Sequence, residues 1–153
     1  MTTAPPRPRL IELSYHELTE RISEALALYA AAMGYPIGTA RQRRDLWLDH
    51  AHRLGWRAVA WIDAAGSLLG IAYGYVGAPG QWWYEEVRRG LSATAPEQLG
   101  WLTDYFELTE LHVRPDAQGR GLGEGLLRAL LDRLDSAHVL LSTPEHGAGP
   151  SGR

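Results

Sequence analysis

One segment limits the folds open to this chain more than any other. Residues 118–125, QGRGLGEG, hold four glycines in eight positions and run directly into LLRALLDRL. In that second part the leucines recur at helical spacing and the charged residues fall on the opposite face. Before the glycines, YFELTELHV over residues 105–113 has the character of a long strand. The segment therefore predicts a strand, a glycine-rich loop and a helix from about Leu122 to Leu134.

Glycines at the start of a helix indicate either a backbone that approaches a ligand closely or a mobile turn that binds nothing. A phosphate loop of the NTPase type would end in Gly-Lys-Ser/Thr, and LGEG has no lysine. A dinucleotide fingerprint fits weakly, because RPDA separates strand from loop and its third glycine position falls on Glu124. A third interpretation places successive N–H groups and the positive end of the helix dipole around one pocket, which suits a pyrophosphate.

The stretch ELHVRPDAQGRGLGEGLLRALL resembles the acetyl-CoA-binding segment of the GCN5-related N-acetyltransferase (GNAT) superfamily in its strand, V-x-P turn, Q/R-x-x-G-x-G/A loop and following helix. The resemblance implies acetyl-CoA as cosubstrate and no metal. Backbone amides of the loop would hold the pyrophosphate, and the strand would bond the pantetheine arm, with the Val113 amide near the thioester carbonyl. The implied cofactor-binding residues are Leu111, His112, Val113, Gln118, Gly119, Arg120, Gly121, Leu122 and Gly123. Arg114 and Arg120 either reach the phosphates or are solvated surface residues.

The rest of the chain predicts one α/β domain of the mixed α+β kind. A chain of 153 residues, 45% of them hydrophobic, buries a single core. A short strand near residues 10–13, two helices and a hairpin formed by WRAVAWI and LLGIAYGYV precede the glycine segment, an order similar to that of the GNAT family. The resemblance implies a GNAT-like acyl-CoA N-acyltransferase fold, with a central mixed, mostly antiparallel sheet flanked by helices. We expect a disordered arm over 1–8, the domain over 9–142 and a flexible segment over 143–153.

Particular residues define the expected elements. Ser14 and Glu17 form a capping box for the first helix, and Thr39 is the expected cap of the second. Gly70 and Gly74 within a strand indicate a bulge or a close neighbour. Residues 77–103 form an excursion with a short helix near residues 82–91. The core-facing positions of the two helices are Leu18, Ile22, Ala25, Leu26, Tyr29, Leu46, Trp47, Leu48, Ala51 and Leu54.

Acyl transfer to an amine needs a base, because a lysine-like amine with a pKa of about 10.4 is mostly protonated near neutral pH. Glu107 and Glu110 lie on the strand that leads to the cofactor loop, where the family often carries such a carboxylate. Each of these two residues acts in catalysis, binds the substrate, or is a strand-end carboxylate that is paired with an arginine or solvated. Strand alternation puts the two on opposite faces unless a bulge intervenes.

An aromatic wall is the candidate acceptor site. It comprises Trp82, Trp83, Tyr84 and Tyr105, and Glu85 and Glu86 beside it could attract a cationic amine. The alternative is that these aromatics only pack against each other.

The end of the sequence lacks an expected part. In the family, a tyrosine on the helix after the strand that would here be HVLLS often protonates the leaving thiolate, and the sequence stops before such a helix. The C-terminal helix and the last strands of the fold are therefore expected to be missing. The chain is interpreted as a fragment, the alternatives being completion by a partner, such as a homodimer, or a degenerate member.

Composition excludes several classes of protein. A net charge of -3 and a pI near 6.0 leave no basic surface for nucleic acid, and the absence of cysteine excludes disulfides and thiolate chemistry. No apolar run spans a bilayer and MTTAPPRPR is no signal peptide, so a cytoplasmic protein is expected. His50 and His52 cannot share a helix face, which argues against a metal site.

The resulting prediction is an N-acetyltransferase that transfers an acetyl group from acetyl-CoA to a primary amine of a small molecule, peptide or protein by direct attack. A non-catalytic acyl-CoA-binding sensor or interaction module of the same fold is the alternative, and a nicotinamide or flavin enzyme is a third possibility.

Overall fold

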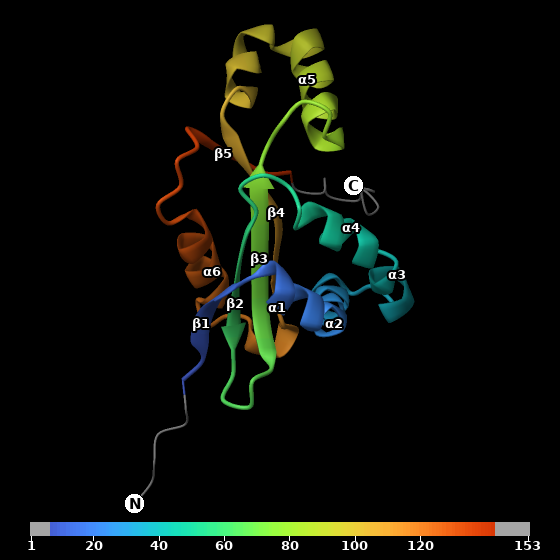
Figure 1. Ribbon diagram of the computed structural model, residues 1–153, viewed down its shortest axis with the longest axis vertical. Helices are drawn as coiled ribbons and strands as arrows, with labels where there is room; N and C mark the ends of the chain where they lie inside the picture. The colour runs from blue at the N-terminus through green and yellow to red at the C-terminus, as the bar shows by residue number, and fades with distance from the viewer. Residues whose placement is uncertain (1–6, 143–153) are drawn as a thin grey trace, which may run out of the picture.

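The structure, a computed structural model, describes residues 7–142 of the chain and is built on one five-stranded sheet. The strands follow each other across the sheet in chain order, and all neighbours are antiparallel except β4 and β5, which are parallel (Figure 1). They are β1 (Arg9–Leu13), β2 (Arg57–Ile62), β3 (Leu68–Val76), β4 (Tyr105–Val113) and β5 (His138–Leu140). The expected mixed, mostly antiparallel sheet is confirmed.

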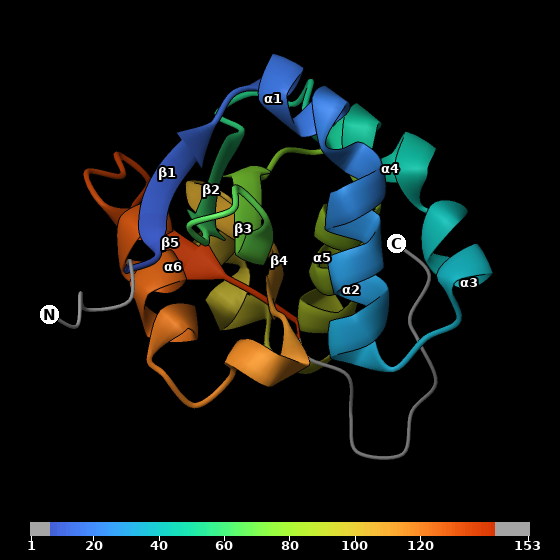
Figure 2. The same cartoon turned by 90° about the horizontal axis from the view of Figure 1, so that it is seen from below.

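Helices cover both faces of the sheet, with α2 on one side and α6 on the other (Figure 2). The first group comprises α1 (Tyr15–Glu20), α2 (Ile22–Met33), α3 (Ile37–Arg41) and α4 (Arg44–His50), and the opposite face carries α6 (Leu122–Leu131). A short 3-10 helix, η2 (Pro115–Ala117), connects β4 to the glycine loop. No helix within residues 7–142 combines the length and apolar character that crossing a membrane requires.

Each face of the sheet has its own hydrophobic core. On the side of α1–α4, residues from the helices pack on Ile62 and Ile71, and Trp47 is completely buried there. On the other side, Leu126 and Leu130 of α6 are completely buried against Phe106. The predicted stripe of leucines is therefore the face by which α6 binds the sheet.

The capping box at the first helix is confirmed. The Glu17 amide donates to Ser14 Oγ at 3.1 Å, and the Ser14 amide donates to Glu17 Oε1 at 3.0 Å. The predicted helix is divided at Arg21, whose backbone leaves the helical region (φ −100°, ψ 10°) and whose guanidinium donates to the carbonyl of Gly66 at 2.9 Å.

The second predicted helix differs more from expectation. It begins at Ile37 after the cap residue Pro36 rather than at Thr39, and it is divided into α3 and α4. The prediction that Leu54 faces the core is wrong, since its exposed fraction is 81%. Because α4 ends at His50, Leu54 lies in the following loop, and the helical spacing no longer applies to its side chain.

The bulge indicated by Gly74 is present where β3 meets β4. The register shifts between Tyr73, which is opposite Glu110, and Gly74, which is opposite Leu108, so that Thr109 is the additional residue. A Cβ on Gly74 would lie 2.3 Å from the carbonyl oxygen of Glu107, and only glycine fits this approach. The bulge places Glu107 and Glu110 on the same face of the sheet.

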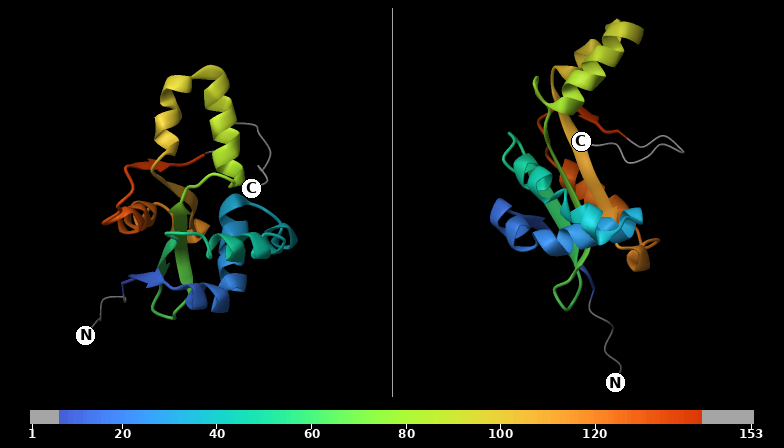
Figure 3. Two further views of the ribbon diagram at one scale, coloured as in Figure 1. Left: turned by 45° about the horizontal axis from the view of Figure 1, so that its top comes forward. Right: turned by 90° about the vertical axis from the view of Figure 1, so that its right-hand side faces the viewer.

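The excursion forms a separate layer beyond one end of the sheet (Figure 3). It consists of α5 (Trp82–Thr94) and the 3-10 helix η1 (Pro96–Leu102), so its helix is longer than predicted. A small core of Trp83, Leu102 and Tyr105 holds it to the start of β4. Residues 1–6 and 143–153, which include most of the predicted arm and the flexible segment, lie outside the described residues.

The helix after the glycine loop ends three residues before the predicted Leu134. Asp132 is extended (φ −63°, ψ 129°) and Arg133 has a φ of 56°, which together reverse the chain toward β5. Leu134 nevertheless packs on the core beside α6, which explains why its spacing matched the helical pattern.

Candidate functional site

The four glycines between Gln118 and Leu126 have different local roles. Gly119 and Gly121 have φ values of 82° and 78°, in the left-handed region that favours glycine, and Gly121 is the N-cap of α6. Gly125 serves packing, because a Cβ there would lie 2.8 Å from the ring of Trp61. The same indole donates to the carbonyl of Leu122 at 2.9 Å. The close packing of α6 on the sheet thus fixes the position of the loop.

A cleft of about 380 Å³ lies between the glycine loop, the end of β4 and the end of α2. Every predicted cofactor-binding residue except Arg120 lines it, and the sequence analysis did not identify the two residues from α2. The lining residues are Ala32, Met33, Leu111, His112, Val113, Gln118, Gly119, Gly121, Leu122 and Gly123.

The backbone of β4 directs hydrogen-bonding groups into this cleft. The amide of Arg114 donates to Leu69 of β3 at 2.8 Å, so strand alternation turns the N–H groups of Val113 and Leu111 away from β3. The amide side chain of Gln118 donates to the Val113 carbonyl at 3.1 Å from that side. Within the described chain, β5 pairs with β4 only at residues 105–107. The edge of β4 at residues 111–113 therefore has no neighbouring strand among the described residues, and it faces the cleft.

The two arginines near the loop both lie against Asp116. Arg114 donates to both of its carboxylate oxygens, at 2.7 and 3.1 Å, and the guanidinium of Arg120 donates to its carbonyl at 3.5 Å. The hydrogen bonds from Arg114 lower the pKa of Asp116 below its usual value.

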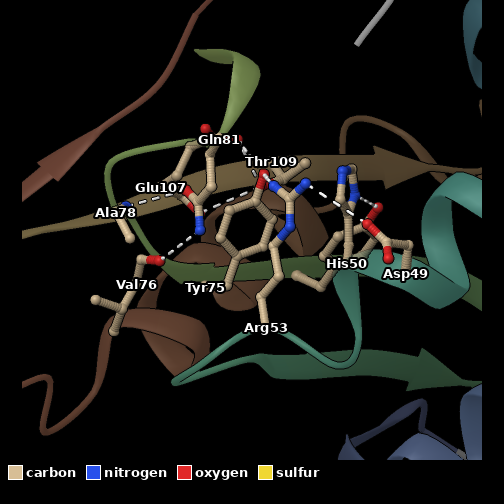
Figure 4. Close-up of polar contacts among 10 residues, drawn as sticks. Asp49, His50, Arg53, Tyr75, Val76, Ala78, Gln81, Glu107 and Thr109 are labelled. Atoms are coloured by element: carbon tan, nitrogen blue, oxygen red, sulfur yellow. Dashed lines mark hydrogen bonds and ion pairs between the residues drawn. The ribbon is translucent and has the colours of Figure 1, made fainter. Parts of the chain in front are cut away.

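Glu107 lies in a buried polar network shown in Figure 4. The Tyr75 hydroxyl donates to Glu107 Oε2 at 3.1 Å, Thr109 Oγ1 donates to the same oxygen at 2.9 Å, and Arg53 donates to the Tyr75 hydroxyl at 2.7 Å. Burial, with the nearby Glu107 carboxylate, raises the pKa of Tyr75 to about 12. Sequence analysis did not identify Arg53 or Tyr75, because only the fold brings them to the strand.

Glu110 lies in a second buried group on the same face. Its Oε2 is 2.7 Å from His112 Nε2, and its Oε1 is 3.9 Å from the guanidinium of Arg43. The ring of Tyr29 contacts the His112 ring edge-on, with centroids 5.0 Å apart. The sequence analysis took His112 as an implied cofactor-binding residue and Tyr29 as a core residue, and it gave Arg43 no role.

The four predicted acceptor-site aromatics do not form one open wall. Trp83 and Tyr105 are buried, with ring centroids 5.6 Å apart, and Tyr84 stacks on Tyr105 at 6.5 Å. Trp82 is exposed. Glu85 and Glu86 pair with Arg88 and Arg89 of the same helix, at 3.0 and 2.7 Å. This cluster lies at the first residue of β4, whereas the cleft lies at its last.

Within residues 7–142, no three His, Asp or Glu side chains come together as a metal site would require. His50 bonds the Tyr73 hydroxyl at 2.8 Å in the core, and the exposed His52 bonds the Tyr15 hydroxyl at 3.1 Å.

Comparison with known proteins gives a consistent result. The acetyltransferase (GNAT) family matches residues 15–146 of this chain. A GCN5-like protein acetyltransferase of Mycobacterium tuberculosis is 44% identical over 160 residues, which cover 89% of this chain and 78% of that protein. An L-methionine sulfoximine/L-methionine sulfone acetyltransferase of Pseudomonas aeruginosa is 30% identical over 136 residues, or 82% of this chain and 66% of that protein.

Solved structures share the fold at low sequence identity. An aminoglycoside acetyltransferase from an uncultured soil metagenomic sample superposes with a TM-score of 0.61 at 15% identity, covering 92% of this chain and 82% of that chain. The aminoglycoside N-acetyltransferase AAC(6')-Iy, solved in complex with CoA, gives a TM-score of 0.59 at 10% identity and covers 100% of this chain and 95% of that chain.

Proposed function

The chain belongs to the acetyltransferase (GNAT) family, and from that premise we propose that it transfers an acetyl group from acetyl-CoA to a primary amine by direct attack on the thioester. The family resemblance and the GNAT-like fold inferred from the sequence are both confirmed. Members of this family are acyl-CoA-dependent N-acetyltransferases, and this chain is one of them. We propose three further points, which are the identity of the acetyl donor, the class of the amine acceptor, and the residues that act on both.

The observation that carries the proposal is the cleft at the end of β4. Its loop offers backbone N–H groups at the N-terminus of α6, where the helix dipole favours an anion such as a diphosphate. A Cβ on Gly119 or Gly121 would meet nothing within 4 Å. Glycine is therefore needed at these positions for the left-handed backbone that forms the loop, and not for space. Residues 118–123 suit a diphosphate, and the N–H groups of Leu111 and Val113 suit the amide-bearing arm next to it.

The reaction needs a polarised carbonyl and a base. The N–H groups of Leu111 and Val113 are the available donors along β4 for an oxygen that gains charge during attack. Glu107 and Glu110 are the candidate catalytic carboxylates, and the bulge at Thr109 brings both to the face of α2 and α4. Because the N–H donors and the two carboxylates lie on one strand, the acetyl group of acetyl-CoA and the attacking amine would meet beside the bulge.

The acceptor is proposed to be a primary amine on a small molecule, peptide or protein. The relatives' names cover this range, since one is called a protein acetyltransferase and another acts on methionine sulfoximine and methionine sulfone. The excursion around Trp82 and Tyr84 is the proposed side from which the amine approaches. Glu85 and Glu86 would have to leave their pairs with Arg88 and Arg89 to bind a cationic amine.

The test is thiol release from acetyl-CoA. The purified protein would be given acetyl-CoA with L-methionine sulfone, a lysine-containing peptide or sisomicin, and free CoA would be measured against a reaction without acceptor. We expect at least one amine to accelerate release, with the acetylated amine found by mass spectrometry. Calorimetric binding of CoA without turnover of any amine would instead support the non-catalytic sensor.

A further inference from the structure

We propose that His112 is the base that accepts the amine's proton during acetyl transfer, and that Glu110 is its positioning residue. This inference rests on the proposed function and deepens it. It reassigns the carboxylate roles expected from the sequence, because Glu110 would act through the histidine and not directly on the amine.

Access to the cleft distinguishes His112 from the two carboxylates. Of the described residues that line the cleft, His112 alone has a titratable side chain. Glu107 and Glu110 are both buried on β4 and do not reach the lining. Glu107 is held by Tyr75 and Thr109 behind the bulge. The group best placed to meet a reactant in the cleft is therefore the imidazole.

The direction of the ring follows from its contacts. The His112 ring packs edge-on against Tyr29 of α2, and Ala32 and Met33, one turn later in α2, form part of the cleft wall. The ring thus lies in the wall that α2 and β4 share. The exposed fraction of its side chain is 10%, against 8% for Glu110, so both are held in a largely water-excluded place.

Glu110 fixes the tautomer of His112. A carboxylate can only accept a hydrogen bond, so Nε2 at 2.7 Å carries the hydrogen and Nδ1 keeps the lone pair. A buried carboxylate likewise orients an imidazole base in hydrolases, although there it holds Nδ1 and leaves Nε2 as the base. Arg43 faces the second oxygen of Glu110 at 3.9 Å, and its cation compensates the carboxylate there.

The proton balance starts from the neutral amine, after its ammonium form has released one proton to solvent, and it then closes with this one group. The amine nitrogen forms a bond to the thioester carbon, the carbon–sulfur bond breaks, and Nδ1 of His112 accepts the proton that the nitrogen loses. The imidazolium can return that proton to the departing thiolate, which gives the amide, free CoA and a neutral His112. No further acid is needed for the stoichiometry.

The experiment compares His112→Gln with His52→Gln. Glutamine at 112 retains an N–H donor for Glu110 but cannot act as a base, whereas His52 is exposed and far along the chain. With the acceptor found by thiol release, His112→Gln is expected to lower kcat on the order of 100-fold or more. The dissociation constant for CoA, measured by calorimetry, should change less than about 3-fold, and His52→Gln should behave as wild type.

Two further measurements separate a base from a structural role. Free imidazole should restore part of the activity of His112→Ala, and Glu110→Gln should lower kcat and alter its pH profile while leaving the KM for acetyl-CoA unchanged. The charged and titratable groups that could influence that profile are Glu110, Arg43, Tyr29 and Tyr73. Full activity in His112→Gln, or loss of CoA binding together with activity, would overturn the proposal. A wild-type protein that binds no CoA would overturn the proposed function itself.

Discussion

Two alanine substitutions in α6 should have opposite effects on stability and on ligand binding. A Cβ on Gly125 would lie 2.8 Å from the Trp61 ring, which its bond to Leu122 holds in place. A Cβ on Gly123 would lie 3.9 Å from Leu111 and Val113, an ordinary contact, but both of those residues line the cleft. The added methyl at 125 therefore clashes with the sheet. The one at 123 has room in the free protein and is expected to obstruct a ligand, because Gly123 itself lines the cleft.

The magnitudes follow from these distances. Overpacking at Gly125 costs about 1–3 kcal/mol, and better helix propensity returns up to about 1 kcal/mol. Gly125→Ala should thus lower the free energy of unfolding by roughly 1–2 kcal/mol, or Tm by roughly 2–8 °C. Gly123→Ala should keep or raise Tm. If the added methyl of Gly123→Ala raises the free energy of the bound state by about 1–3 kcal/mol, CoA should bind roughly 5- to 150-fold more weakly.

The assays are thermal unfolding followed by circular dichroism and calorimetric titration with CoA. Gly123→Ala should bind less tightly while melting no lower than wild type, and Gly125→Ala should melt lower. Wild-type CoA binding by Gly123→Ala, or an unchanged Tm for Gly125→Ala, would contradict the roles assigned to these two glycines.

Three other perturbations test the fold. Leu126→Ala should destabilise by about 2–5 kcal/mol because the side chain is completely buried, whereas Leu54→Ala should change stability by less than about 0.5 kcal/mol, and denaturant unfolding would distinguish them. Ser14→Ala should cost about 0.5–2 kcal/mol in the same assay through loss of the capping box. Folding raises the pKa of Tyr75 to about 12, so the unfolded state loses that proton first, and stability should fall between about pH 10 and pH 12. Unfolding of Tyr75→Phe should show a smaller decline over that range, and an identical decline would contradict the assignment.

The parts of the fold that local signals determine were predictable from sequence. β4 was predicted with its exact bounds, because an aromatic, apolar run lies between turn residues. The capping box at Ser14 and the bulge at Gly74 were also recognisable, since each depends on residues close in sequence or on a glycine in a strand. Leu54 was misplaced because periodicity alone cannot tell where a helix stops.

The site was predictable only on its backbone side. The loop residues follow from a contiguous motif, whereas the group around His112 joins β4 to Tyr29 and to Arg43, which are distant along the chain. Whether Glu107 and Glu110 share a face depended on the bulge, which the sequence indicated without locating the additional residue at Thr109. Side-chain networks of this kind form through tertiary packing, and no spacing rule reports them.

We propose that the amides between Gln118 and Gly123 bind the diphosphate of coenzyme A. The protein would be titrated calorimetrically with CoA and, in parallel, with pantetheine, which lacks the diphosphate together with the adenosine 3′-phosphate beyond it. CoA should bind at least about 100-fold more tightly than pantetheine, since two hydrogen bonds to a charged group contribute about 3 kcal/mol or more. Equal affinity for the two ligands, or no heat with CoA, would contradict it.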